Sequence, residues 1–330
     1  MDPITLDIVR DPRWFPLRFD VRDDAFQFAR IEPEMHRALT FLSDLRPSPG
    51  EIRRVSRSSV GKIPVGEAPL HVILHSGLGG STFLARALGV AGVVTTLKEP
   101  PILTDLVAFA LKNGCNRQLV SKVADLLGRP FSRGEAVVIK MSSTGNGLGA
   151  AIARDRPETQ ILCLQTPLQL MIASLVSRGD DGRAGGRRLF LGMQNAGMIA
   201  AQPSGDHDDL QLVALAWLSI QKIMLEAAAA FGPRRVKSLS SEQLMEDRRT
   251  SLAAVAAHFS LDLDVEARFA SGIFERHAKT GQPFDAQHRK DQLQLVLRAH
   301  DAEIQPVIEW ARKVADASGI AWDLPNPLLD

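Results

Sequence analysis

A glycine-rich stretch, HSGLGGST (His75–Thr82), has residue types and spacing that could bind a ligand. Its glycines let the backbone turn tightly after an apolar run, so that successive amide N–H groups can face one concavity. Two hydroxyl residues then open a helix, whose N-terminus carries a partial positive charge. These are the parts of a phosphate site, and its candidate binding residues are Gly77, Gly79, Gly80, Ser81 and Thr82. The alternative is a plain glycine-rich turn between a strand and a helix.

This loop lacks the lysine of a standard nucleotide-binding loop. A Walker A sequence, G-x-x-x-x-G-K-[ST], has a lysine directly before the Ser or Thr, and Gly80 stands at that place here. Kinase chemistry uses that lysine on the β- and γ-phosphates of ATP. The loop therefore disfavours ATP as the ligand.

The elements that must position the loop alternate between strands and helices. Short apolar runs rich in β-branched residues, each followed by helix-compatible sequence, occupy residues 70–76, 93–99, 136–143, 160–166 and 235–240. This alternation predicts an α/β fold with a mostly parallel sheet covered on both faces. After Ser240 the pattern is almost entirely helical, and the segment Ser177–Phe190, rich in glycine and arginine, is interpreted as a connecting loop.

The first 66 residues form a separate extension in this interpretation. Alternation over residues 19–28 predicts a hairpin and residues 34–45 predict a short helix, followed by a loop-like linker. We therefore expect an N-terminal extension over 1–66 and one α/β domain with a helical C-terminal part over 67–330.

Composition indicates an ordinary soluble protein. Hydrophobic residues make up 45% and charged residues 23% of the 330 residues, and the formal net charge of +1 predicts no attraction to nucleic acid or an anionic membrane. The two cysteines, Cys115 and Cys163, match neither a disulfide framework nor a zinc site. The start of the chain has no apolar signal segment. Polar residues interrupt the apolar stretch Leu210–Phe231, which we interpret as a buried helix. We expect a cytoplasmic protein.

Residues 70–300 resemble the P-loop sulfotransferase-like family, whose members bind the sulfate donor PAPS. SGLGGSTFLARAL is similar to the family's 5′-phosphosulfate loop, and LKEPPIL follows at the second strand, where many members carry a basic residue and a Glu. VVIKMSS resembles the third-strand element, and ILCLQTPLQLMIASLVSR occupies the place of the family's "VRDP…S" segment. The resemblance implies a three-layer α/β/α fold with about five strands in the sheet.

The chain departs from the family pattern at the residues that contact phosphate. Leu78 stands where the loop has a basic residue, and Gln165 stands where the family has the arginine that holds the donor's 3′-phosphate. The serine that the family pattern places in this segment lies one position later than expected, at Ser174. The sequence HRKD (residues 288–291) has only a weak similarity to the family's RKGxxGDW loop. These departures leave open whether the chain binds PAPS.

The resemblance also suggests which residues do the chemistry. Sulfuryl transfer needs a base for the acceptor's proton and positive charge for the sulfuryl oxygens. Glu99 is the candidate base and Lys98 the candidate stabiliser, because they end a strand where ligands bind in open α/β sheets. Lys140 and Ser174 are further candidate donor-binding residues. The alternatives are a surface ion pair between Lys98 and Glu99 and a solvated Lys140.

Weaker candidates complete the set. The arginines at 183, 187 and 188 could close over an anion as a lid, or could simply be solvated. His75 could face the donor, although a packed histidine is the more ordinary role for that position. His277 and Lys279 fall where relatives carry a basic element before the C-terminal helix.

The sequence thus predicts a PAPS-dependent sulfotransferase that acts on a hydroxyl or amine of a small molecule or peptide and releases PAP. It predicts no need for a metal, no nucleic-acid or membrane partner, and no particular oligomeric state. Two alternatives stay open: a kinase-like phosphotransferase that uses Lys98 or Lys140 in place of the loop lysine, and a non-catalytic nucleotide-binding module.

Overall fold

The computed structural model describes residues 3–63, 68–199, 207–276, 278, 281–283 and 285–329. The chain divides into two compact units. Unit 1 comprises residues 1–73, 82–161 and 256–264, and unit 2 comprises residues 74–81, 162–255 and 265–330. The predicted domain boundary between residues 66 and 67 falls outside the described residues and stays a prediction.

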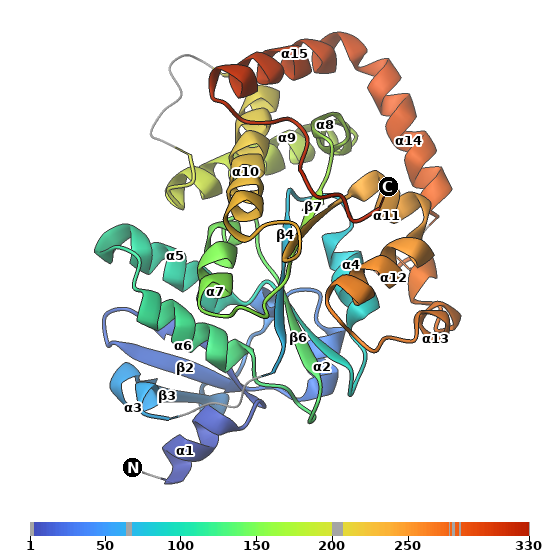
Figure 1. Ribbon diagram of the computed structural model, residues 1–330. Coiled ribbons are helices and arrows are strands. Elements are labelled where there is room, and N and C mark those ends of the chain that lie inside the picture. The colour runs from blue at the N-terminus through green and yellow to red at the C-terminus, as the bar shows by residue number, and fades with distance from the viewer. Residues whose placement is uncertain are drawn as a thin grey trace. The chain divides into compact units, whose positions relative to one another are not determined.

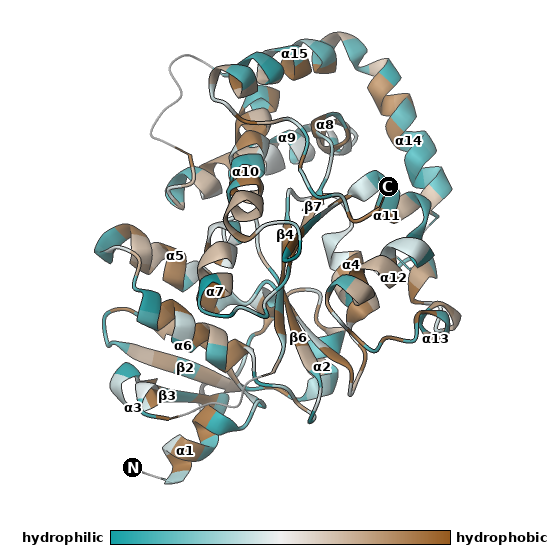
Figure 2. Ribbon diagram, in the orientation of Figure 1, coloured by the Kyte–Doolittle hydropathy of each residue, from teal (hydrophilic) through white to brown (hydrophobic). Residues whose placement is uncertain are grey.

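A five-stranded parallel sheet flanked by helices confirms the predicted fold class. Its strand order is β5-β6-β4-β7-β8. The strands, each at a predicted position, are β4 (Leu70–His75), β5 (Val94–Lys98), β6 (Ala136–Lys140), β7 (Ile161–Gln165) and β8 (Val236–Ser240). All residues of β4, β5 and β6 are buried, as expected for parallel strands covered on both faces. Figure 2 accordingly shows β4 and β6 as mostly hydrophobic.

Parallel pairing aligns the carboxyl ends of β5 and β6. Thr95 pairs with Val137 and Lys98 pairs with Lys140, so the two strands end at the same register. The amide of Glu99 continues this pairing and donates to the Lys140 carbonyl at 2.9 Å. The residues that follow these strands therefore lie side by side.

The N-terminal part of unit 1 contains the predicted hairpin within a larger sheet. Strands β1 (Trp14–Asp20) and β2 (Ala25–Arg30) pair antiparallel, and β3 (Ile52–Ser56) adds to β2 (Figure 1). The helix predicted over 34–45 is shorter than expected, because helix α2 (Pro33–Ala38) ends before the 3₁₀ turn η1 (Leu42–Asp44).

The other elements before residue 161 are mostly helices. They are α1 (Pro3–Arg10), η2 (Pro49–Glu51), α3 (Arg57–Gly61), α4 (Ser81–Leu88), α5 (Pro101–Asn113), α6 (Arg117–Leu127), η3 (Asn146–Leu148) and α7 (Gly149–Arg154).

Buried Arg129 ties the start of the chain to the end of α6. Its guanidinium, 5% exposed, donates to the carbonyl oxygens of Ile8, Val9, Asp11, Trp14 and Leu126. Burial lowers the pKa of Arg129 to about 9. A buried charged side chain thus joins residues 8–14 to the end of α6 through hydrogen bonds to backbone carbonyls.

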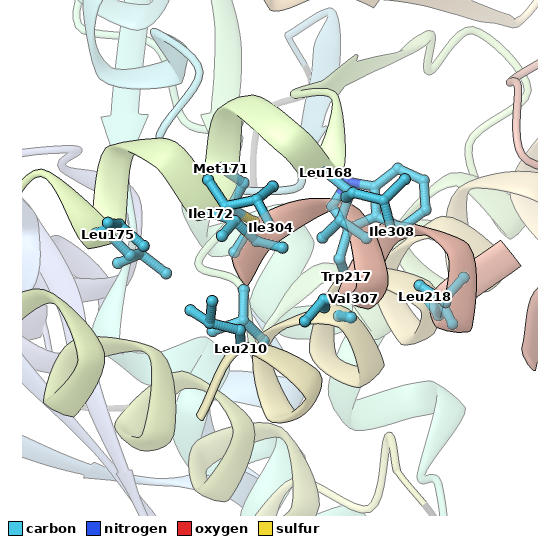
Figure 3. Close-up of a cluster of buried hydrophobic side chains, with 14 of the residues drawn as sticks. Leu168, Met171, Ile172, Leu175, Leu210, Trp217, Leu218, Ile304, Val307 and Ile308 are labelled. Atoms are coloured by element: carbon cyan, nitrogen blue, oxygen red, sulfur yellow. The ribbon is translucent and has the colours of Figure 1, made fainter. Parts of the chain in front are cut away.

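Unit 2 is built around a helical core. The elements after β7 are α8 (Leu168–Val176), α9 (Gly179–Asn195), α10 (Asp209–Phe231), α11 (Ser241–Glu246), α12 (Arg248–His258), α13 (Val265–Ala270), η4 (Ile273–Glu275), α14 (Ala286–Ala299) and α15 (Asp301–Ala317). Apolar side chains of α8, α10 and α15 pack together, among them Ile172, Trp217 and Ile308 (Figure 3).

Helix α10 is long and apolar enough to cross a membrane by length and composition alone. Its side chains supply much of the unit 2 core, however, and Val213, Ala214 and Trp217 are almost completely buried. This packing agrees with the predicted buried helix.

The segment Ser177–Phe190 is not the connecting loop that the sequence indicated, because helix α9 covers most of it. Two of its glycines are required for close packing. A Cβ at Gly182 would overlap the Leu175 carbonyl, and a Cβ at Gly186 would overlap the Val213 side chain. Glycine here permits close contact between helices, although its low helix propensity suggested a loop.

Candidate functional site

The loop after β4 presents a row of unpartnered amides in unit 2. Gly77, Leu78 and Gly80 have φ values of +93°, +55° and +84°, a conformation that favours glycine and is uncommon for leucine. Within the described part of the chain, the amides of residues 77–80 donate no hydrogen bond. Ser81 and Thr82 begin α4, so their amides have no partner inside the helix. Such a run of N–H groups is suited to an anion.

Thr166, directly after β7, holds this loop in shape. Its hydroxyl donates to the Gly77 carbonyl at 2.8 Å, and its amide donates to the Ser76 hydroxyl at 2.6 Å. Its own carbonyl accepts from the Trp217 indole at 2.8 Å. The loop conformation is therefore fixed by the core of unit 2.

The glycines of the loop also allow close packing. A Cβ at Gly79 would overlap the Thr166 hydroxyl, and a Cβ at Gly80 would lie 2.5 Å from the terminal methyl of Met245 on α11. A side chain at Gly79 would therefore disturb the packing, and a side chain at Gly80 would be strained by the positive φ at that position.

Neither Leu78 nor Gln165, which stand where the sequence resemblance would place a basic residue, offers a charge. The Leu78 side chain packs against the core cluster of unit 2. The Gln165 amide donates to Gln221 at 2.8 Å and to the Trp322 carbonyl at 3.2 Å. Gln165 thus holds the C-terminal segment rather than a ligand.

Two arginines meet at Ser174. The buried Ser174 hydroxyl accepts from Arg178 at 3.0 Å and from Arg289 of α14 at 2.7 Å. Within the described residues, no carboxylate forms an ion pair with either guanidinium. Burial, and then the like charge of Arg178, hold the pKa of Arg289 below its usual value. Two adjacent cations without a carboxylate form a site of positive potential suited to a phosphate.

Glu99 and Lys140 form an ion pair in unit 1. The Glu99 carboxylate contacts the Lys140 ammonium, which is 2% exposed, while Glu99 remains 24% exposed. Glu99 has a φ of +58°, and such strain is concentrated at functional sites. The carboxylate is therefore both fixed by a buried partner and accessible to solvent.

Lys98 points elsewhere. Its ammonium donates to the carbonyls of His36 at 2.9 Å and Arg37 at 3.1 Å, at the end of α2. Burial, and then the charge of Arg86, lower the pKa of Lys98 to about 8. The alternative of a surface ion pair between Lys98 and Glu99 is thus wrong, because the partner of Glu99 is Lys140. A solvated Lys140 is also wrong.

The weaker candidates have mixed outcomes. Arg183 pairs with Glu303, and Arg187 pairs with Asp209 at 2.6 Å, so these two arginines belong to a packed helix and not to a mobile lid. His75 is buried at the end of β4. His277 and Lys279 lie outside the described residues.

The sequence did not indicate a role for Arg178, and it indicated Arg289 only through the weak similarity of HRKD (residues 288–291) to the family's RKGxxGDW loop. Arg178 lies in the segment that was interpreted as a loop, and Arg289 is 115 positions from Ser174. Local sequence does not distinguish these two arginines from other arginines on the surface, because their shared contact with Ser174 appears only in the fold.

Comparison with solved structures finds likenesses at low sequence identity. No family model and no curated protein matches the chain. It is similar to a sulfotransferase domain from the curacin biosynthetic pathway, with 14% identity over 79% of this chain and 99% of that one and a TM-score of 0.44. It is also similar to a sulfotransferase domain from the Synechococcus PCC 7002 olefin synthase, with 15% identity over 79% of this chain and 98% of that one and a TM-score of 0.41. Function must therefore follow from the residues of the site.

Proposed function

We propose that this protein is a PAPS-dependent sulfotransferase. The observation that carries the proposal is the row of unpartnered amides from Gly77 to Gly80 ahead of α4. These amides, with Ser81 and Thr82, would hold the 5′-phosphosulfate of the donor. Since Gly80 replaces the lysine that ATP chemistry requires, a donor that needs no such lysine fits the loop better.

The arginine pair supports a second phosphate on the ligand. Arg178 and Arg289 share the Ser174 hydroxyl and have no carboxylate partner within the described residues. PAPS carries a 3′-phosphate on its ribose in addition to the 5′ group, whereas the phosphates of ATP form one chain. In this proposal the two arginines take over the role that the sequence resemblance gave to the position of Gln165.

Glu99 would act as the general base. Its carboxylate takes the proton of the acceptor hydroxyl or amine while the acceptor's oxygen or nitrogen atom forms a bond to the sulfur of PAPS. The bond between sulfur and the bridging oxygen of the 5′-phosphate breaks, and PAP leaves with the electron pair. Loop amides stabilise the charge that develops on this phosphate. Lys140, in contact with Glu99, orients the base.

We further propose a small-molecule or peptide acceptor and a cytoplasmic location. The net charge of +1 gives no general attraction to nucleic acid or to an anionic membrane.

A ligand-binding series tests the donor. PAP should stabilise the protein against heat more than ATP with Mg²⁺ does, because a ligand bound to the native state adds about 2.7 kcal/mol at 100 times its Kd. A larger shift with ATP and Mg²⁺ would favour the phosphotransferase. Binding of PAP without transfer of ³⁵S from labelled PAPS to any acceptor in a hydroxyl and amine panel would favour the binding module.

Two neighbouring residues of α14 provide a matched pair of variants. Arg289→Ala should weaken PAP binding by about 10- to 150-fold, since a hydrogen bond to a charged group contributes about 1.5–3 kcal/mol. Lys290→Ala removes an exposed cation paired with Glu246 and should leave PAP affinity within about 3-fold. Equal effects of the two variants in calorimetry would contradict the assignment of the arginine pair.

Loss of the base should have a different signature. Glu99→Gln preserves shape and should keep PAP affinity within a few-fold, while turnover falls by roughly 10²–10⁴-fold. Normal turnover of this variant would exclude Glu99 as the base.

A further inference from the structure

One short segment of the N-terminal extension contacts both lysines associated with Glu99. Residues 36–41 supply the two carbonyls that bind the Lys98 ammonium. The same segment supplies Phe41, whose ring centroid is 5.2 Å from the Lys140 ammonium nitrogen. Lys98 precedes Glu99 in the chain, and Lys140 is its ion-pair partner. Both neighbours of the candidate base are thus held by residues more than fifty positions away in sequence.

The contact with Lys98 has a clear physical basis. The last carbonyls of a helix lack partners within the helix, and a cation at this end satisfies them. His36 and Arg37 lie in the last turn of α2, and their carbonyls accept from Lys98. Lys98 is 1% exposed, and no carboxylate pairs with it within the described residues. The α2 carbonyls are therefore the groups that hold this buried charge.

The contact with Lys140 restricts the other side of the pair. An ammonium within about 6 Å of an aromatic centroid is attracted to the ring face. Phe41 meets this condition, so its ring covers part of the Lys140 ammonium while Glu99 contacts it. This arrangement limits the directions in which the ion pair can turn.

The conformation of Glu99 requires such restraint. A non-glycine residue with φ near +58° costs about 1–3 kcal/mol and persists only when its surroundings fix it. Lys98, the residue before Glu99, is anchored by the His36 and Arg37 carbonyls, and the Glu99 amide donates to the Lys140 carbonyl at 2.9 Å. Glu99 is therefore fixed through Lys98 at the end of β5 and through Lys140 at the end of β6.

We infer that residues 36–41 are a positioning element for the base, with Lys98 and Phe41 as the positioning residues. This inference rests on the proposed role of Glu99. It assigns the N-terminal extension a function in catalysis in addition to packing, and it changes the role of Lys98 from a stabiliser of the sulfuryl group to an anchor.

Three variants separate positioning from general packing. Lys98→Met removes the anchor and Phe41→Leu removes the ring, while Phe19→Leu makes the same chemical change elsewhere in the extension. Phe19 contacts the rings of Phe26 and Phe109 and is the matched control. Lys98→Arg restores a cation that can reach the carbonyls.

The kinetic result expected is a fall in kcat by about 10- to 100-fold for Lys98→Met and Phe41→Leu, because misplacement of a catalytic group by about 1 Å has effects of this size. The KM for PAPS should stay within about 3-fold of the wild type. Phe19→Leu should keep kcat within about 3-fold of the wild type, and the kcat of Lys98→Arg should be higher than that of Lys98→Met. A kcat for Phe41→Leu and Lys98→Met equal to that of Phe19→Leu would overturn the inference.

A second readout does not depend on turnover. In protein labelled with ¹⁵N-lysine, the Lys140 ammonium signal is assigned by its loss in Lys140→Met. Solvent exchange of its protons should accelerate in Lys98→Met and in Glu99→Gln, but not in Phe19→Leu. If the wild type transfers no sulfuryl group, the proposed function fails and this exchange rate alone decides the positioning. Unchanged exchange in Lys98→Met would overturn the inference even in an active enzyme.

Discussion

The ion pair between Glu99 and Lys140 leads to a specific prediction about stability. Lys140 is 2% exposed and Glu99 is 24% exposed, so the pair is mostly removed from water. Glu99→Gln removes the carboxylate that the buried ammonium contacts, and Lys140→Met removes the ammonium. Each single variant leaves one charge without this partner, whereas the double variant removes both charges.

The size of the effect follows from this burial. Breaking a buried pair by removing one partner costs about 3–5 kcal/mol, and replacing both partners is often neutral. Because Glu99 reaches solvent and glutamine still offers an acceptor oxygen, we expect a loss of about 2–3 kcal/mol for Glu99→Gln. Lys140→Met should lose about 1–2 kcal/mol, since the remaining carboxylate can turn toward water. The double variant should lose about 1 kcal/mol, which is about 2–4 kcal/mol less than the sum of the two single losses and gives the coupling energy.

Chemical unfolding of the wild type and the three variants measures this coupling. A pair on the surface contributes only about 0–1 kcal/mol. Additive losses within about 0.5 kcal/mol would therefore refute the reasoning that the pair is buried and coupled. A double variant less stable than either single variant would refute it as well.

Three further predictions concern the fold. Arg129→Lys should lower the free energy of unfolding by about 3–5 kcal/mol, because an ammonium cannot match the fork of donors buried among the backbone carbonyls, and near-normal stability in urea would contradict this. Burial lowers the pKa of His36 to about 3, so its imidazole stays neutral in the folded state, whereas in the unfolded state it binds a proton below about pH 6.5. The free energy of unfolding should therefore fall as the pH drops from 7 to 5, and His36→Leu should reduce that fall by about 2 kcal/mol. Titration curves of equal slope for both proteins would show that His36 does not contribute. Gly186→Ala should destabilise the protein by about 1–3 kcal/mol, because its Cβ would overlap the Val213 side chain. Gly185→Ala should be neutral or stabilising, because its Cβ would lie 3.7 Å from the nearest side chain. Identical melting temperatures for the two variants would contradict the packing argument.

Much of the fold could be predicted from the sequence because it depends on local patterns. Runs such as Leu70–His75 and Ala136–Lys140 are short, apolar and rich in β-branched residues, and each forms a buried parallel strand. The glycines of the loop after β4 indicated a tight turn before a helix, and the structure has both. Local pattern failed at α9, where glycine indicated a loop. Packing against Leu175 and Val213 requires residues without a Cβ, and this requirement depends on neighbours that the local sequence does not identify.

The sequence by itself determined which residue types end the strands, and thereby placed Lys98, Glu99 and Lys140 at one edge of the sheet. Only the tertiary structure decided which lysine pairs with Glu99, because that choice depends on α2, whose terminal carbonyls bind Lys98. The same holds for Ser174 and Arg289, which are 115 positions apart and meet only when α14 packs on α8. Charge and hydrogen-bonding capacity belong to each residue, but a partner is a neighbour in space, and chain packing selects it.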